Sequence, residues 1–189
     1  MTPRIPPLPR DEWPNAMGEA IAALRPEHPR HPILTTDGGR PKAINALSTL
    51  ANHVELTRAF HVFTGHLLYG TTLDLRTREL LILRVAAIRG CEYEWKQHEV
   101  IAGDIGLRDD EIAATRGEAS TPVLRAVDEL LADACIAERT WTELTSTLDT
   151  QQLMDLVFTV GAYDLLAMAF LSFGVEIDHD LAEWKRPSP

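Results

Sequence analysis

Apolar residues recur at helical spacing from about residue 44 onward, and this feature limits the chain to one class of fold. In residues 122–136, for example, the apolar side chains fall three or four positions apart, which places them on one face of a helix. No stretch sustains the alternation of apolar and polar residues that is typical of a half-buried strand, and no internal repeat is evident. The sequence therefore predicts an all-α bundle.

Capping and helix-stopping residues divide this pattern into separate helices. We expect helices over about 12–25, 44–68, 74–89, 91–103, 108–116, 122–136, 140–148 and 153–173. Aspartate favours the N-terminal cap of a helix, so Asp74 indicates a helix start. Glycine commonly ends a helix, so Gly70 and Gly90 indicate helix ends.

The N-terminal part of the chain differs from the rest. Prolines are frequent in residues 1–10 and 25–41, which predicts an extended arm and a long loop on either side of one short helix. We expect residues 1–42 to form this segment and residues 43–189 to form a single helical domain, a division that the length of 189 residues allows.

Composition and charge argue against several classes of partner. Apolar residues make up 45% of the chain and charged residues 24%, as in an ordinary globular protein. The net charge of −10 disfavours nucleic acid and anionic membranes, which attract basic surfaces. The first ten residues lack the apolar core of a signal peptide, so we expect a cytoplasmic protein. Two cysteines, Cys91 and Cys135, form no disulfide framework.

The apolar segment 153–173 is long enough to raise the question of a membrane span. Asp155 and Asp164 interrupt it, and no cluster of basic residues flanks it. We therefore expect a core helix or a subunit-interface helix, and no membrane partner.

The residues from Cys91 to His98 are the part of the chain whose side chains suggest chemistry. Cys91, Glu94 and His98 stand at positions i, i+3 and i+7, so they share one face of a helix. Glu79, twelve residues before Cys91, lies on the preceding helical segment and could reach the same place if the two helices pack antiparallel. These four residues are the candidate proton-transfer set.

Each of the four has a structural interpretation beside the catalytic one. Glu94 and His98 could form a direct hydrogen bond that orients a general base, or a simple surface pair. Cys91, at a helix N-terminus, could be a reactive thiol or a small packed side chain. Glu79 could belong to the site or could pair with nearby arginines.

The same residues include possible metal ligands. Glu79, Glu94 and His98 could bind an ion, with His61 and His66 on an earlier helix. The pair four residues apart is Glu–His, however, and not the pair of histidines of the His-Glu-x-x-His zinc motif. We expect no metal and no cofactor, and we interpret His61 and His66 as residues of the core edge or of loops.

Two adjacent stretches, residues 75–86 and residues 91–112, together resemble the carboxymuconolactone decarboxylase family, which includes the AhpD-type alkylhydroperoxidases. The resemblance is specific over about residues 70–115 and weaker over 44–70 and 150–175. It implies an all-helical fold that assembles as trimers or hexamers.

The hydroperoxidase branch of that family uses a glutamate, a Cys-x-x-Cys pair and a histidine four residues after the second cysteine. In this sequence the glutamate corresponds to Glu79, the first cysteine to Cys91 and the histidine to His98, while Glu94 stands in place of the second cysteine. The resemblance therefore implies the family's site without its dithiol, and argues against a thioredoxin-like peroxidase cycle.

Three functions remain open from the sequence. The leading hypothesis is an acid–base enzyme that decarboxylates or isomerises a small organic acid or lactone, with His98 as the proton carrier, Glu94 orienting it and Glu79 relaying the proton. The second is a peroxide-reducing enzyme that uses Cys91 alone. The third is a non-enzymatic, oligomeric ligand-binding protein with a degenerate site. A small molecule and further copies of the chain are the expected partners.

Overall fold

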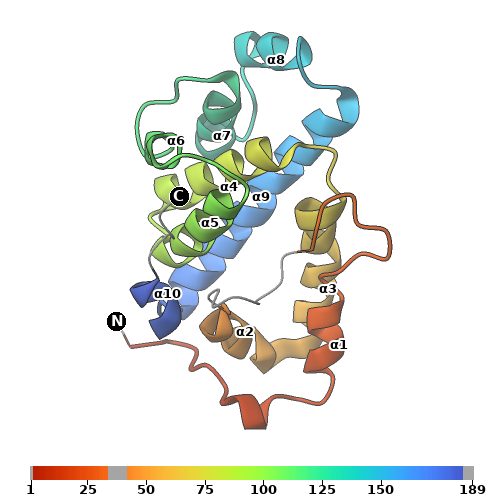
Figure 1. The fold of residues 1–189 in the computed structure, drawn as a ribbon, viewed down its shortest axis with the longest axis vertical. Helices are drawn as coiled ribbons and strands as arrows, with labels where there is room; N and C mark the ends of the chain where they lie inside the picture. Colours follow the sequence, from red (N-terminus) through yellow and green to blue (C-terminus); the bar gives the residue numbers. More distant parts are fainter. Residues whose placement is uncertain (1, 34–41, 185–189) are drawn as a thin grey trace. The chain divides into compact units, whose positions relative to one another are not determined.

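The computed structural model describes residues 2–33 and 42–184, and every regular element within these ranges is helical (Figure 1). The expected all-α fold is confirmed. Backbone packing divides the chain into two compact units, residues 1–71 with 169–189 and residues 72–168. The domain boundary expected at residue 42 falls within the first unit.

The described part of the first unit contains six short helices besides the N-terminal turn η1 (Arg10–Glu12) and the end of α9. They are α1 (Met17–Ala22), α2 (Ile44–Leu50), η2 (Ala51–His53), α3 (Val54–Gly65), the π-helical turn η3 (His66–Gly70) and α10 (His179–Glu183). The N-terminal arm is held by backbone hydrogen bonds, from Arg4 and Ile5 to the carbonyl of Phe173 and from Leu8 to that of Ser48.

Helices α1 and α3 pack closely in this unit. A Cβ atom at Gly65 would lie 2.6 Å from the carbonyl oxygen of Leu24, so the approach of the two backbones requires glycine there. On the same helix, the buried His61 ring places Nδ1 2.8 Å from the carbonyl oxygen of Ala20. His61 is thus a core histidine, as its sequence context suggested.

The second unit holds the remaining helices. They are α4 (Leu75–Arg89), α5 (Glu92–Asp104), α6 (Asp109–Ala114), α7 (Pro122–Asp133), α8 (Glu138–Thr145) and most of α9 (Thr150–Phe173). Helix α4 packs against both α5 and α7, which makes it the centre of this unit. Its residues 81–86 are all buried, as the apolar sequence of this segment predicts.

A tight turn joins α4 to α5 in an antiparallel helix hairpin. The Asp74 side chain accepts a hydrogen bond from the Thr77 N–H at 2.9 Å and so caps the start of α4, as expected. Gly90 ends α4 with a φ of +66°, a left-handed conformation that glycine adopts without a steric cost. Cys91 is then the N-cap residue of α5. The hairpin brings Glu79 and the residues of α5 onto facing surfaces.

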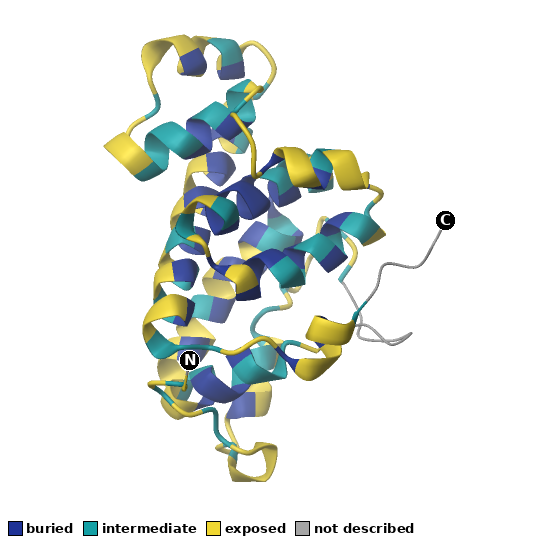
Figure 2. Cartoon of the chain, turned by 90° about the vertical axis from the view of Figure 1, so that its left-hand side faces the viewer, coloured by how far each residue is buried: buried dark blue, intermediate teal, exposed yellow. Residues whose placement is uncertain are grey.

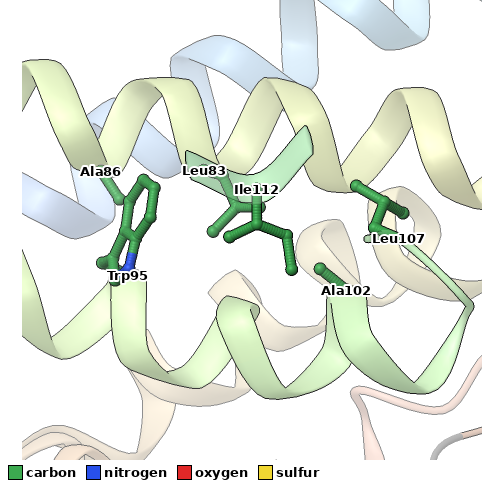
Figure 3. Packing of buried hydrophobic residues seen from close by; sticks show 6 residues of the cluster. All are labelled: Leu83, Ala86, Trp95, Ala102, Leu107 and Ile112. Carbon is green, nitrogen blue, oxygen red and sulfur yellow. The ribbon is translucent and has the colours of Figure 1, made fainter. Parts of the chain in front are cut away.

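Apolar side chains between the two helices hold the hairpin together. Figure 3 shows this cluster, with side chains from α4 and α5 and from the segment that follows. Its buried members are Leu83, Ala86, Trp95, Ala102, Leu107 and Ile112. Arg116 covers the Trp95 ring at 3.8 Å from its centre and forms an ion pair with Glu92. This packing fixes the rotation of α5 and with it the direction in which its polar residues point.

Helix α9 carries acidic side chains that bind to residues of its own unit. Asp155 accepts hydrogen bonds from the backbone N–H and the hydroxyl of Thr72 at 2.6 and 2.7 Å. Asp164 receives two hydrogen bonds from Arg89 at the end of α4. Each of the two aspartates that interrupt the apolar sequence therefore binds another residue of the protein.

Another side of α9 is apolar and exposed, and we call it the α9 stripe. Figure 2 shows by burial colour where the helices are exposed. The stripe consists of Met154, Val157, Phe158, Leu165 and Met168. By length and composition alone α9 could cross a membrane, with a mean hydropathy of 1.8. Its contacts with Thr72 and Arg89 are those of a helix packed on protein.

The helix boundaries differ from the expected ones in a few places. The segment expected as a helix over 12–25 forms only η1 and the short α1, and the run expected over 44–68 is broken into α2, η2, α3 and η3. Helix α10 is an addition, because the sequence pattern around His179 is irregular and predicts no helix there. The expected loop over 25–41 lies partly outside the described residues.

Candidate active site

Glu79 is the centre of a buried ion cluster on α4. Its side chain is fully buried, and its two oxygens have different partners. Oε1 accepts a hydrogen bond from Nε of Arg78 at 2.8 Å and forms an ion pair with Nη2 of Arg78 at 2.7 Å. Oε2 lies 2.7 Å from Nδ1 of His98 on α5. Oε1 therefore makes the pair with an arginine that the structural interpretation of Glu79 expects. Oε2 makes the contact within the candidate site that the catalytic interpretation expects.

The surroundings of Glu79 keep its carboxylate ionised. Burial by itself would raise the pKa of Glu79, but the charges of His98 and Arg78 and their hydrogen bonds outweigh burial and hold the pKa below its usual value. Glu79 is thus an anion enclosed between an imidazole and a guanidinium group.

His98 is oriented by two contacts. Nδ1 is held by Glu79, and the imidazole ring meets the edge of the Tyr163 ring at a centroid distance of 5.0 Å and an interplanar angle of 88°. Nε2 is engaged by no hydrogen bond within the described residues. Because 9% of the side chain is exposed, the ring is nearly buried but not sealed. Nε2 is the atom of this site that can exchange a proton with a substrate.

Cys91 is a buried thiol at the start of α5. Burial and, after it, the negative charge of Glu94 raise the pKa of Cys91 to about 11, despite opposing hydrogen bonds with the backbone of Glu94 and Tyr93. At pH 7 only about one molecule in ten thousand would carry the thiolate at this pKa. Cys135 is exposed, lies in the segment after α7 and forms no disulfide.

Glu94 is buried without a counter-charge. Only 1% of the residue is exposed, and neither carboxyl oxygen has a hydrogen-bond partner among the described residues. Burial first, and then the negative charge of Asp164, raise the pKa of Glu94 well above its usual value. The surroundings therefore favour the protonated form of Glu94 and the ionised form of Glu79.

This geometry corrects one expectation about the site. Glu94 was expected to hydrogen-bond His98 across one helical turn, but His98 instead binds Glu79 of the neighbouring helix. The reason is tertiary: the packing of α4 on α5 presents an ionised, arginine-bound carboxylate to Nδ1, and Glu94 has no such support.

The structure brings some of the predicted residues together and adds others. Glu79 and His98 are in direct contact, and Glu94 contributes to the raised pKa of Cys91. The sequence indicates Arg78 only as one of several arginines close to Glu79, and it does not indicate Tyr163 at all. The apolar pattern around Tyr163 gives no signal for it, because it reaches His98 from a helix 65 positions further along the chain.

A metal centre is not supported in the part of the chain that the structure describes. No three histidine, cysteine or acidic side chains cluster there in a way that could hold an ion. His53 accepts a hydrogen bond from the Leu56 N–H at the start of α3, which is a capping role.

Comparison with known proteins finds a family whose model matches this helix hairpin. The model of the carboxymuconolactone decarboxylase family matches residues 55–131, which include α4, α5 and all four candidate residues. This segment of the chain is therefore similar to that family. The match confirms the resemblance drawn from the sequence, and no curated protein sequence is significantly similar to this chain.

Several solved structures share the fold of this chain. A peroxidase-related protein from Silicibacter sp. TM1040 matches with a TM-score of 0.73 and 16% identity, over 97% of each chain. A peroxidase-related protein from Ralstonia eutropha JMP134, with an alkylhydroperoxidase AhpD core, matches with a TM-score of 0.70 and 17% identity, over 96% of this chain and 95% of that one. An Agrobacterium tumefaciens protein of unknown function, described as a putative antioxidant defence protein AhpD, matches with a TM-score of 0.61 and 16% identity. The match covers 68% of this chain and 94% of that one. At these identities the similarity establishes the AhpD-like fold.

Proposed function

We propose that this protein is a member of the carboxymuconolactone decarboxylase family and an acid–base enzyme that moves a proton on a small organic acid or lactone, in a decarboxylation or a related lyase or isomerase reaction. The observation that carries the proposal is the 2.7 Å contact between His98 Nδ1 and Glu79 Oε2. It leaves Nε2 of an oriented imidazole for the substrate.

The proposed proton carrier is His98. As a base, Nε2 takes a proton from the carbon next to a carbonyl group; as an acid, it returns a proton to the carbanion or enolate that remains. Glu79 fixes the ring orientation and stabilises the imidazolium that forms when Nε2 is protonated. Arg78 keeps Glu79 ionised, so the proton stays on His98 rather than passing to the carboxylate.

A one-cysteine peroxidase is the second candidate, and the peroxidase-related names of the structural neighbours support considering it. Attack on a peroxide needs the thiolate of Cys91. The pKa of about 11 keeps this residue protonated, since burial opposes its ionisation. The electrostatics of the site therefore favour proton transfer over peroxide reduction.

We also propose that the chain forms a homo-oligomer, with the α9 stripe packed against another copy. The stripe is continuous along α9, and five apolar side chains that are 36% to 57% exposed are typical of an interaction surface. A cytoplasmic location, with no nucleic-acid or membrane partner, is part of the same proposal and is consistent with the net charge of −10.

Proton exchange at carbon tests the first half of the proposed reaction directly. The chain is incubated in D₂O with a panel of small keto acids, lactones and enones, and NMR measures deuterium uptake at the carbon next to the carbonyl. We expect catalysed exchange with at least one class, abolished in His98→Gln and retained in Cys91→Ser. Consumption of an organic hydroperoxide with dithiothreitol, dependent on Cys91 and without any carbon exchange, would instead establish the peroxidase.

A further inference from the structure

Glu94 is the buried ionisable group that the mechanism above does not use. It lies on α5 one turn before His98 and one turn after Cys91, on the same face of the helix. Positions four apart on a helix hold their Cβ atoms about 5–6 Å from each other. Glu94 and His98 are therefore neighbouring side chains on this face.

Other polar atoms in this region are also buried and unpartnered. They are Nε2 of Gln97, on α5, and the hydroxyl of Thr159, on α9. Thr159 is fully buried and stands one helical turn before Tyr163, whose ring contacts His98. An unpaired buried polar group costs free energy, so the unpartnered groups of Glu94 and Gln97 on α5 indicate a surface built for a polar ligand.

The charges near Glu94 determine what kind of ligand suits it. Arg78 is bound to Glu79, and Arg89 is bound to Asp164 through two hydrogen bonds. Both arginines are thus already paired with a carboxylate, and the charge that acts on Glu94 is that of Asp164. A carboxylate ligand would meet further repulsion here, whereas an uncharged oxygen could accept a hydrogen bond from the protonated carboxyl group.

We propose that the carboxylic acid of Glu94 hydrogen-bonds to the uncharged carbonyl oxygen of the substrate while His98 Nε2 moves the proton on the adjacent carbon. This inference rests on the proposed acid–base function and names the group that the substrate must carry. A lactone or ketone carbonyl fits; a free carboxylate at this point does not. Glu94 is then a catalytic residue distinct from the His98 base.

The proton balance of this step is complete without a further reactant. His98 Nε2 takes the proton from the carbon, and the electrons of that C–H bond form a C=C bond. The carbonyl π electrons move to the oxygen, where the Glu94 O–H group stabilises the enolate. Return of the proton from His98 to carbon restores the carbonyl and both side chains. The two glutamates thereby have separate roles. The neutral Glu94 donates a hydrogen bond to the substrate oxygen, and the ionised Glu79 orients His98.

Infrared spectroscopy of the full-length chain tests the protonation that this role requires. We expect the carbonyl stretch of a protonated carboxylic acid at pH 7, lost in Glu94→Gln and retained in Glu92→Gln. Glu92 is the matched control because it is exposed on the same helix and bound to Arg116. A spectrum at pH 7 in which Glu94 contributes only carboxylate bands would overturn the proposal.

Ligand binding tests the hydrogen bond itself, with γ-butyrolactone and butyrate as matched uncharged and anionic probes. We expect the lactone to bind more tightly than butyrate, with its carbonyl stretch shifted to lower frequency by the hydrogen bond. Glu94→Leu should weaken lactone binding about three- to tenfold, and Glu94→Gln, which keeps an N–H donor, should weaken it less. Preference for butyrate, no lactone binding, or an unchanged stretch in Glu94→Leu would each overturn it.

The two proposals fail in distinguishable ways. If the lactone binds through Glu94 but His98→Gln leaves carbon exchange unchanged, the acid–base function of His98 is wrong and the carbonyl contact stands. If exchange depends on His98 but Glu94 is ionised or does not affect lactone binding, the proposed function stands and the role of Glu94 is wrong.

Discussion

His98 and Glu79 are nineteen residues apart in the chain, and the α4–α5 hairpin brings Nδ1 of one within 2.7 Å of Oε2 of the other. Arg78 binds the remaining oxygen of the same carboxylate. The three side chains form a buried Arg–Glu–His series in which each oxygen of Glu79 has one partner. The imidazole at the end of this series has an atom available for a substrate.

Replacement of His98 should abolish the proposed chemistry without unfolding the chain. His98→Gln removes the proton carrier, so the catalysed exchange at carbon should fall about a hundred- to ten-thousandfold. The rate is measured by NMR in D₂O, and circular dichroism monitors the fold. The control is His179→Gln, because His179 is exposed and far along the chain at the start of α10. Equal rates in wild type and His98→Gln would exclude His98 as the carrier.

Removal of Glu79 should destabilise the fold more than a surface carboxylate does. Glu79→Ala leaves the buried guanidinium of Arg78 without its anion, and breaking a buried ion pair in this way costs about 3–5 kcal/mol. Urea denaturation measures the loss of unfolding free energy. Asp110→Ala is the control, because that carboxylate is exposed and its pair with Arg108 lies at the surface. Losses of similar size in the two variants would contradict the buried cluster.

Glu94 should make stability depend on pH in the direction opposite to an ordinary ion-paired carboxylate. Its pKa in the folded chain lies above the unfolded value of about 4.3, so the folded state binds the proton more tightly. Its favourable effect is complete below the unfolded pKa and is lost as the pH rises toward the folded one.

Denaturant unfolding between pH 4 and pH 9 tests this linkage. Relative to wild type, Glu94→Gln should gain stability as the pH rises, because the amide never has to lose a proton in the interior. Glu92→Gln should show no such trend, since that side chain is exposed. A gain for Glu94→Gln that is the same at every pH would mean that Glu94 has an ordinary pKa.

The two cysteines should react in an order set by burial. Cys91 has a pKa of about 11 and is buried, whereas Cys135 is exposed. Iodoacetamide at pH 7.5 should therefore alkylate Cys135 much faster than Cys91, as mass spectrometry of the digested chain will show. Faster modification of Cys91 would instead support the peroxidase hypothesis. So would a Cys91–Cys135 disulfide that forms while the protein consumes peroxide.

The α9 stripe should mediate self-association. Leu165→Arg places a charge in the middle of the stripe and should lower the mass measured by light scattering to that of a single 21.0 kDa chain. Trp141→Ser is the control, because Trp141 is an exposed apolar residue on α8, away from the stripe. A wild-type chain of monomeric mass at micromolar concentration would contradict the proposed oligomer.

Local features of the chain were predictable from the sequence because their causes are local. Helical spacing indicated the all-α class, Asp74 the start of α4, and Gly90 its end with a positive φ. The shared helical face of Cys91, Glu94 and His98 follows from the 3.6-residue period alone. The resemblance to the family could be identified from the same short region, because the family's motif residues stand close together in the chain.

The partners of the site residues were decided only by tertiary structure. The sequence by itself determined that a thiol, two carboxylates and an imidazole lie on neighbouring helices. It could not tell which carboxylate binds the imidazole, since a bond across one turn of α5 and a bond between helices were both possible. The packing of α4 on α5 settled this by presenting Glu79 to His98 and burying Glu94 without a cation. The charge states of the two glutamates differ because ionisation depends on surrounding charge and burial, which the fold supplies.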